Sequence, residues 1–174
     1  MVPVPELLQA IRKQYLLPWD GLHGVSHWGR VFENGLRLAA ATGADRDVLL
    51  LFCLFHDACR VNEGWDRGHG RRGAELAASL RGESFQVSRR QFELLYEACA
   101  LHTEGLTEGD PTLQTCWDSD RLDLPRASIS LEPDRLCTEA ARDQAVIAWA
   151  TARSLKRDVP AWLFADWGSQ DGIA

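Results

Sequence analysis

Hydrophobic positions recur along nearly the whole chain with the spacing of amphipathic helices, and strict strand-type alternation is scarce. The most apolar segment covers residues 48–55 and follows Asp45 and Asp47, either of which can cap the start of a helix. A run of this kind also suits a buried strand, but its acidic start and total length favour a helix. We therefore predict a central helix, buried on nearly every side, that ends at about Arg60.

Helix signals of the same kind surround this segment. Ser26 is a good N-cap for a helix that continues to Thr42 and is stopped by Gly43, and Pro18 closes a shorter amphipathic helix. Besides the central helix, the predicted helices cover residues 6–17, 26–42, 70–80, 88–102, 112 to about 123, and 133–155. The pattern predicts an all-α fold.

The composition suits one globular domain. The chain has 174 residues, of which 45% are hydrophobic and 25% charged, and no repeat or long linker divides it. We expect a single domain over residues 1–174, in which residues 133–174 supply the C-terminal helix and a packed or loosely ordered tail. The seven tryptophans are expected to lie in the core rather than to act as base-stacking platforms.

Charge and termini exclude several classes of protein. A net charge of -6 and a pI near 5.3 disfavour binding to bulk nucleic acid, because such proteins need a basic surface. The N-terminus lacks the basic-then-apolar order of a signal peptide, and the run at 48–55 is far short of the roughly 18 residues that span a membrane. We expect a cytoplasmic protein without a membrane partner.

The five cysteines are an odd number and form no C-x-x-C pair. This pattern disfavours both a disulfide framework and a structural zinc knuckle. They are expected to be reduced, mostly buried thiols.

The buried central run ends on two polar residues, His56 and Asp57. Adjacent residues of a helix point about 100° apart, so both side chains can straddle one ion that lies off the helix end. A buried imidazole and a buried carboxylate are costly unless they are paired or bound to metal. Further ligands are therefore expected on neighbouring helices.

Two other segments offer such ligands. His27 lies in the first turn of the second predicted helix, with Arg30 one turn later on the same face. Asp118 and Asp120 lie in an otherwise apolar helical segment, and they point about 200° apart, so they cannot both face one ion.

Three motifs in this order, HWGRV at 27–31, FHDA at 55–58 and DSDRLD at 118–123, resemble the HD superfamily of metal-dependent phosphohydrolases. The motif core of the resemblance covers about residues 24–125. It implies an HD-type bundle of about six to eight helices. It also implies metal ligands at His27, His56, Asp57 and Asp120, with Asp118 as the alternative fourth ligand.

The same resemblance extends to His69 in GHGRRGAE and to His102 in LHTEG, which are similar to family positions near the phosphate or a second metal. With Asp57, they are the candidate catalytic residues. The general acid or base is left open among His69, His102, Glu63 and Asp66. The cations expected to bind substrate phosphate in this acidic protein flank the motifs and are Arg30, Arg71, Arg72 and Arg121.

Two imidazoles and two carboxylates suit an octahedral divalent ion with water in the other positions, so Mn, Fe, Co, Ni or Mg fits better than Zn. A second ion is left open near His69 and His102. The implied activity is hydrolysis of a phosphate ester or anhydride, most plausibly of a nucleotide, by metal-bound water that Asp57 orients. The histidine-pair motif of cyclic-dinucleotide phosphodiesterases and the Glu-Asp motif of alarmone hydrolases are both missing. The alternative is a catalytically inactive metal- or nucleotide-binding sensor, and a homodimer is left open.

Overall fold

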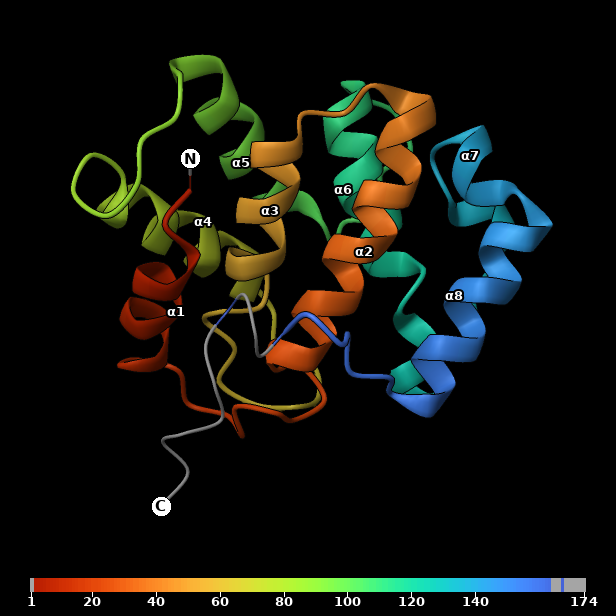
Figure 1. Cartoon of the computed structure of the whole chain (residues 1–174), viewed down its shortest axis with the longest axis horizontal. Helices are drawn as coiled ribbons and strands as arrows, with labels where there is room; N and C mark the ends of the chain where they lie inside the picture. The colour runs from red at the N-terminus through yellow and green to blue at the C-terminus, as the bar shows by residue number, and fades with distance from the viewer. Residues whose placement is uncertain (1, 164–166, 168–174) are drawn as a thin grey trace.

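The computed structural model describes residues 2–163 and 167, which fold into eight α-helices and two 3-10 helices without a β-strand (Figure 1). The predicted all-α fold is thereby confirmed. The α-helices are α1 (Val4–Arg12), α2 (Val25–Thr42), α3 (Arg46–Phe55), α4 (His69–Leu80), α5 (Arg89–Leu101), α6 (Pro111–Arg121), α7 (Glu139–Arg142) and α8 (Gln144–Lys156), and the 3-10 helices are η1 (Leu124–Ala127) and η2 (Pro133–Arg135).

Helix α3 is the centre of the fold, as predicted, and packs against α2, α4, α5 and α6. The Asp45 carboxylate caps its start by accepting hydrogen bonds from the Asp47 and Val48 amides. The helix ends at Phe55, five residues earlier than expected, because the chain turns there and the Arg60 amide donates back to the Asp57 carbonyl. His56 and Asp57 thus lie at the buried end of the central helix.

The start of α2 differs from the prediction in its cap. The N-cap is Gly24, not Ser26, because the Ser26 hydroxyl donates to the Asp20 carboxylate in the preceding loop. The helix begins at Val25, so His27 still lies in its first turn. The predicted stop is confirmed, since Gly43 adopts a left-handed conformation with φ of 69°.

The continuous helix predicted over residues 133–155 is wrong. The chain there forms η2, α7 and α8 in succession, and Thr138 and Asp143 each cap a new helix start. The physical cause of the break lies in α6, where the Asp118 carboxylate accepts hydrogen bonds from the Cys137 and Thr138 amides. Backbone donors used in this way fix a helix N-terminus instead of continuing a helix.

Two glycines allow α4 to approach the ends of its neighbours closely. A Cβ atom at Gly73 would lie 2.1 Å from the Phe55 carbonyl oxygen at the end of α3. A Cβ atom at Gly70 would lie 2.3 Å from the Cys99 carbonyl oxygen of α5. Backbone contacts therefore set the spacing of α4 from α3 and α5.

Helices α7 and α8 contribute to a small second apolar cluster with α2, formed by Leu38, Leu122, Leu136, Ala141 and Ala150. Of the predicted tail, Leu163 and Trp167 are buried, whereas residues 164–166 and 168–174 lie outside the described residues.

Each of the five cysteines, all in the described part of the chain, is a free thiol. Across the same residues, no helix combines the length and apolarity that crossing a membrane requires.

Candidate metal centre

All five histidines of the chain gather around the carboxylate of Asp57, although they come from five separate places in the fold. They are at most 8% exposed. They lie in the loop before α2, in the first turn of α2, at the end of α3, at the start of α4 and at the end of α5, and are His23, His27, His56, His69 and His102.

Four of these imidazoles have their Nδ1 atoms engaged by acceptors. The Nδ1 of His27 lies 2.7 Å from the Asp123 carboxylate, and that of His56 lies 3.1 Å from the Phe52 and Cys53 carbonyls. The other two face backbone carbonyl oxygens three residues earlier in the chain, Asp66 O at 2.6 Å from His69 and Cys99 O at 2.8 Å from His102. An acceptor oxygen requires a proton on the nitrogen that it meets, so each Nδ1 carries the hydrogen. Each Nε2 is thereby turned toward Asp57, and that of His69 lies 3.0 Å from Asp57 Oδ1.

The four Nε2 atoms meet in two pairs. The Nε2 atoms of His27 and His56 are 3.0 Å apart, and those of His69 and His102 are also 3.0 Å apart. Burial lowers the pKa of His27 to about 3 and that of His102 to about 4, so these two rings are neutral at physiological pH. A guanidinium group approaches one nitrogen of each pair, since Arg126 Nη2 lies 3.0 Å from His27 Nε2 and Arg60 Nη1 lies 3.1 Å from His69 Nε2.

This spacing fits a metal ion. Two nitrogens about 2.1 Å from one ion and at right angles to each other lie about 3.0 Å apart, whereas tetrahedral ligands at the same bond length lie about 3.4 Å apart. The nitrogen spacing of each pair is therefore compatible with two ligands of one divalent ion.

Asp57 lies between the two pairs and offers one carboxylate oxygen to each. Its Oδ2 is 3.6 Å from His27 Nε2 and 3.8 Å from His56 Nε2, while its Oδ1 is 3.0 Å from His69 Nε2 and 3.8 Å from His102 Nε2. In both groups the ligand atoms all lie within 4.8 Å of one another. Burial alone would raise the pKa of Asp57, but His56 and hydrogen bonds from other histidines hold it well below its usual range. The carboxylate is therefore ionised.

The two acids of the DSD triplet have different surroundings. Asp120 Oδ1 lies 3.5 Å from His27 Nε2 and 3.8 Å from His56 Nε2, as a fourth ligand of the first pair would. Within the described part of the chain, the Asp118 carboxylate is bonded to neither a histidine nor an arginine. Its carboxylate accepts three hydrogen bonds from Cys137 and Thr138, which makes it a structural residue.

Asp123, not an acid of the DSD triplet, orients His27. It is 1% exposed, and it accepts both the His27 Nδ1–H and a bidentate pair of bonds from Arg30 at 2.8 and 3.0 Å. An acceptor on Nδ1 fixes the tautomer of a ligating histidine and makes it more basic. The sequence contained the signal, because Asp123 follows Asp120 by three residues within the quoted DSDRLD motif, but its partner could not be identified from sequence.

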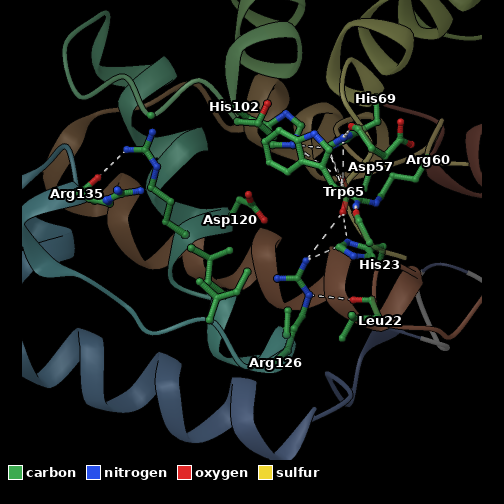
Figure 2. A pocket seen from close by; sticks show the side chains of 18 of the residues that line it. Leu22, His23, Asp57, Arg60, Trp65, His69, His102, Asp120, Arg126 and Arg135 are labelled. Carbon is green, nitrogen blue, oxygen red and sulfur yellow. Dashed lines mark hydrogen bonds and ion pairs between the residues drawn. The ribbon is translucent and has the colours of Figure 1, made fainter. Parts of the chain in front are cut away.

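A cavity of about 850 Å³ opens above this cluster (Figure 2). Asp57, His69, His102 and Asp120 form part of its lining, whereas His27 and His56 are fully buried beside them. The cavity is also lined by arginines from several segments, which are Arg60, Arg67, Arg121, Arg126 and Arg135.

Of the four arginines predicted to bind substrate, three have other partners and Arg71 lies outside the cavity lining. Arg30 is 3% exposed and bonded to Asp123, and Arg72 Nη2 donates to both carboxylate oxygens of Asp66. Arg71 is exposed and does not line the cavity. Arg121 does line it, but its Nη atoms donate to the carbonyls of residues 106 and 135.

Two residues at the cavity were missed in the sequence. His23 Nδ1 lies 2.8 Å from Asp57 Oδ2, and its four-residue spacing from His27 gave no helical signal because Gly24 caps the helix between them. Arg126, in η1, directs Nη2 to within 3.0 Å of His27 Nε2 and 3.9 Å of Asp57 Oδ2. Figure 2 shows both side chains pointing toward Asp57.

Comparison with known proteins agrees with this arrangement. The HD domain family matches residues 24–141, more than half of the chain, and this range includes His27, His56, Asp57 and Asp120. Neither the curated proteins nor the solved structures include a significant match. The chain belongs to the HD domain family, whose members are in general metal-dependent phosphohydrolases.

Proposed function

We propose that the protein hydrolyses a phosphate ester or anhydride, most plausibly of a nucleotide, at the cavity above Asp57. The observation that carries this proposal is the pairing of imidazole Nε2 atoms on both sides of that carboxylate. Six potential ligand side chains converge there from separate elements, an arrangement suited to ion binding rather than to protein stability.

The first ion would be held by His27, His56, Asp57 and Asp120, and a second by Asp57, His69 and His102. When bound, a divalent ion lowers the pKa of a water ligand and neutralises charge on phosphoryl oxygens. The chain's own part is to fix the ligands. Asp123 orients His27, and backbone carbonyls orient the other three rings.

Two arginines place positive charge beside the same cluster. Arg126 Nη2 is within 3.9 Å of Asp57 Oδ2, and Arg60 Nη1 lies 3.5 Å from Asp57 Oδ1. Both side chains are buried and line the cavity. Their guanidinium groups are in position to stabilise phosphoryl oxygens as charge develops on them.

The candidates for proton transfer can now be narrowed. His69 and His102 face each other as a ligand pair, and Asp66 is bonded to Arg72 and to the Val61 amide. Glu63 lines the cavity with a side chain that is 38% exposed, and its carboxylate lies 3.7 Å from His23 Nε2. We assign to Glu63, which contacts His23, the role of transferring a proton to the leaving oxygen.

The test begins with elemental analysis of the purified protein, followed by turnover of phosphomonoesters, nucleotides and diesters with each divalent ion. We expect at least one transition metal per chain, and phosphate or pyrophosphate release that a chelator stops and added ion restores. The double variant His56→Ala/Asp57→Ala should bind no metal and lack activity. The circular dichroism spectrum of the variant must remain helical, so that loss of metal and activity is not caused by unfolding. Removal of the metal from the wild type with a chelator tests the same dependence of activity on metal without a mutation.

The outcomes separate the two functions. A chain that neither contains nor takes up a divalent ion contradicts the site itself. A chain that binds metal, shows no turnover on the whole panel and melts at a higher temperature with added nucleotide is the inactive sensor.

A further inference from the structure

Trp65 departs from the expectation that the tryptophans lie in the core. It is 87% exposed, whereas the other six, all within the described part of the chain, are half-buried or buried. It also lines the cavity above Asp57 (Figure 2). An indole has one of the largest apolar surfaces of any side chain, so leaving it in water forgoes much stabilisation that burial would give.

The loop that carries Trp65 is held in place on both sides. After it, Asp66 is 8% exposed, accepts a hydrogen bond from the Val61 amide at 2.8 Å and pairs with both oxygens to Arg72 at 2.7 Å. Before it, Arg60 donates to the carbonyls of residues 62 and 64. The backbone on either side of the exposed indole is therefore fixed by buried charged groups.

The same loop is tied to the metal centre. Arg60 Nη1 lies 3.1 Å from His69 Nε2 and 3.5 Å from Asp57 Oδ1. The position of Trp65 is thus set relative to Asp57, where the phosphate would be cleaved.

The rest of the cavity lining includes apolar as well as polar groups. Apolar side chains from the loop before α2 and from the η1 region line it, namely Leu22, Leu124, Ala127, Ile129 and Leu131. Ile129 is 51% exposed, so this lining is also incompletely covered by the protein. A ligand with a phosphate and a flat apolar group matches a cavity that has both kinds of lining.

We propose that Trp65 is the residue that determines specificity, by stacking on a planar group of the substrate whose phosphate lies at Asp57. This deepens the proposed function and rests on it. The shared chemistry is a flat π face close to a phosphate, which a nucleobase or a simple aromatic ester can supply. Stacking of a base on an aromatic side chain changes affinity about 5- to 150-fold by alanine substitution, without strong base preference.

The experiment compares kcat/KM for adenosine 5′-monophosphate, phenyl phosphate and ribose 5-phosphate, the last of which lacks a planar group. Trp65→Leu keeps an apolar side chain without a flat ring, and Trp65→Tyr keeps a ring. We expect Trp65→Leu to lower kcat/KM about 10- to 100-fold for a planar substrate and less than about twofold for ribose 5-phosphate. Trp65→Tyr should retain most of the wild-type value.

The matched control is Trp149→Phe on α8, a half-buried tryptophan outside the cavity that packs against Arg37 and Arg153. It should leave all three values unchanged. An equal loss for all three substrates in Trp65→Leu, or no loss for either planar one, overturns the proposal. A loss for phenyl phosphate alone assigns the stacking to simple aromatic esters, and a loss for the nucleotide assigns it to nucleobases.

A second readout needs no turnover. Trp65 is the exposed indole, so its fluorescence should be quenched by adenosine 5′-monophosphate in the metal-loaded protein and not by ribose 5-phosphate. In Trp65→Leu this quenching should disappear and the Kd for the nucleotide should rise at least fivefold. If nothing on the panel is hydrolysed, unchanged nucleotide affinity in Trp65→Leu still overturns the stacking role, whereas a raised Kd supports it in a non-hydrolysing pocket.

Discussion

The Nδ1 atom of His27 and the Oδ2 atom of Asp123 are 2.7 Å apart, although 96 positions of the chain separate the two residues. The same carboxylate neutralises the buried Arg30 guanidinium. Burial would raise the pKa of Asp123, but its bonds to His27 and Arg30 hold it far below the usual value, so the group is ionised. One buried carboxylate thus aims a ligand ring and balances a buried cation.

Asp123→Asn should weaken metal binding about 10- to 100-fold, because the amide is a weaker acceptor and can turn its NH₂ group toward His27. Isothermal titration of the chelator-treated protein with Mn²⁺ or Ni²⁺ measures the change. A melt of the metal-free variant separates this effect from unfolding. Wild-type affinity in a folded Asp123→Asn protein would show that the orientation of His27 does not depend on the charge.

The DSD triplet gives a second prediction. Asp120→Ala should lose metal affinity and activity together, because its Oδ1 lies within 3.8 Å of both Nε2 atoms of the first pair. Asp118→Ala should keep most of its metal and lose about 3 kcal/mol of stability, because it leaves the backbone donors of Cys137 and Thr138 unsatisfied. Metal content and urea unfolding are measured on both variants. A metal-free Asp118→Ala beside a metal-loaded Asp120→Ala would reverse the assignment.

Arg67 and Arg71 form a matched pair for testing the phosphate contacts. Both are exposed, but Arg67 lines the cavity and its guanidinium makes no hydrogen bond or ion pair within the described residues, whereas Arg71 lies outside the lining. Arg67→Ala should raise KM for a phosphorylated substrate several-fold, and more strongly at low salt, because an exposed cation attracts the anion over about 10 Å. Arg71→Ala should leave KM unchanged. Equal effects would mean that general surface charge, not the cavity, attracts the substrate.

Stability of the metal-free protein should fall as the pH is lowered from about 6.5 toward 4. Burial lowers the pKa of His27 to about 3 and of His102 to about 4, while an unfolded histidine titrates near 6.5. Between these values the unfolded chain binds protons that the folded chain does not, so unfolding is favoured by up to about 1.4 kcal/mol per pH unit for each histidine. Urea unfolding of the chelator-treated protein at pH 7.5, 6 and 5 gives the slope. A profile that is flat across this range would contradict the neutral, buried state of these rings.

The sequence was most informative where local pattern and chemistry coincide. The apolar run before His56 predicted the central helix, because a helix that is apolar on every side must be buried on every side. The two polar residues at its end predicted a metal site. Asp45 and Gly43 acted as capping residues because their effect depends on the adjacent backbone alone. Each of these features can be recognised without knowing which helix lies next to which.

The features that the sequence did not predict depend on contacts between residues far apart in the chain. The break in the segment 133–155 depends on the Asp118 carboxylate, and the contact of Asp123 with His27 depends on how α6 packs on α2. Helical periodicity carries no information on such long-range partners. The exposure of Trp65 likewise depends on a loop held by Arg60 and Asp66, and composition favours the core for any tryptophan.

Gly73 takes no part in the chemistry of the site. The need for a residue without a side chain nevertheless restricts the sequence at this position as strongly as metal binding restricts it at a ligand. A methyl group there would meet the Phe55 carbonyl oxygen at 2.1 Å, and backbone cannot move aside as a flexible side chain can. Helix α4 would have to shift, and His69 at its first position would move away from the Asp57 oxygen that it now faces at 3.0 Å. Substitutions tolerated at this position are therefore expected to be as few as those at His69 itself, although residue 73 touches neither ion nor substrate.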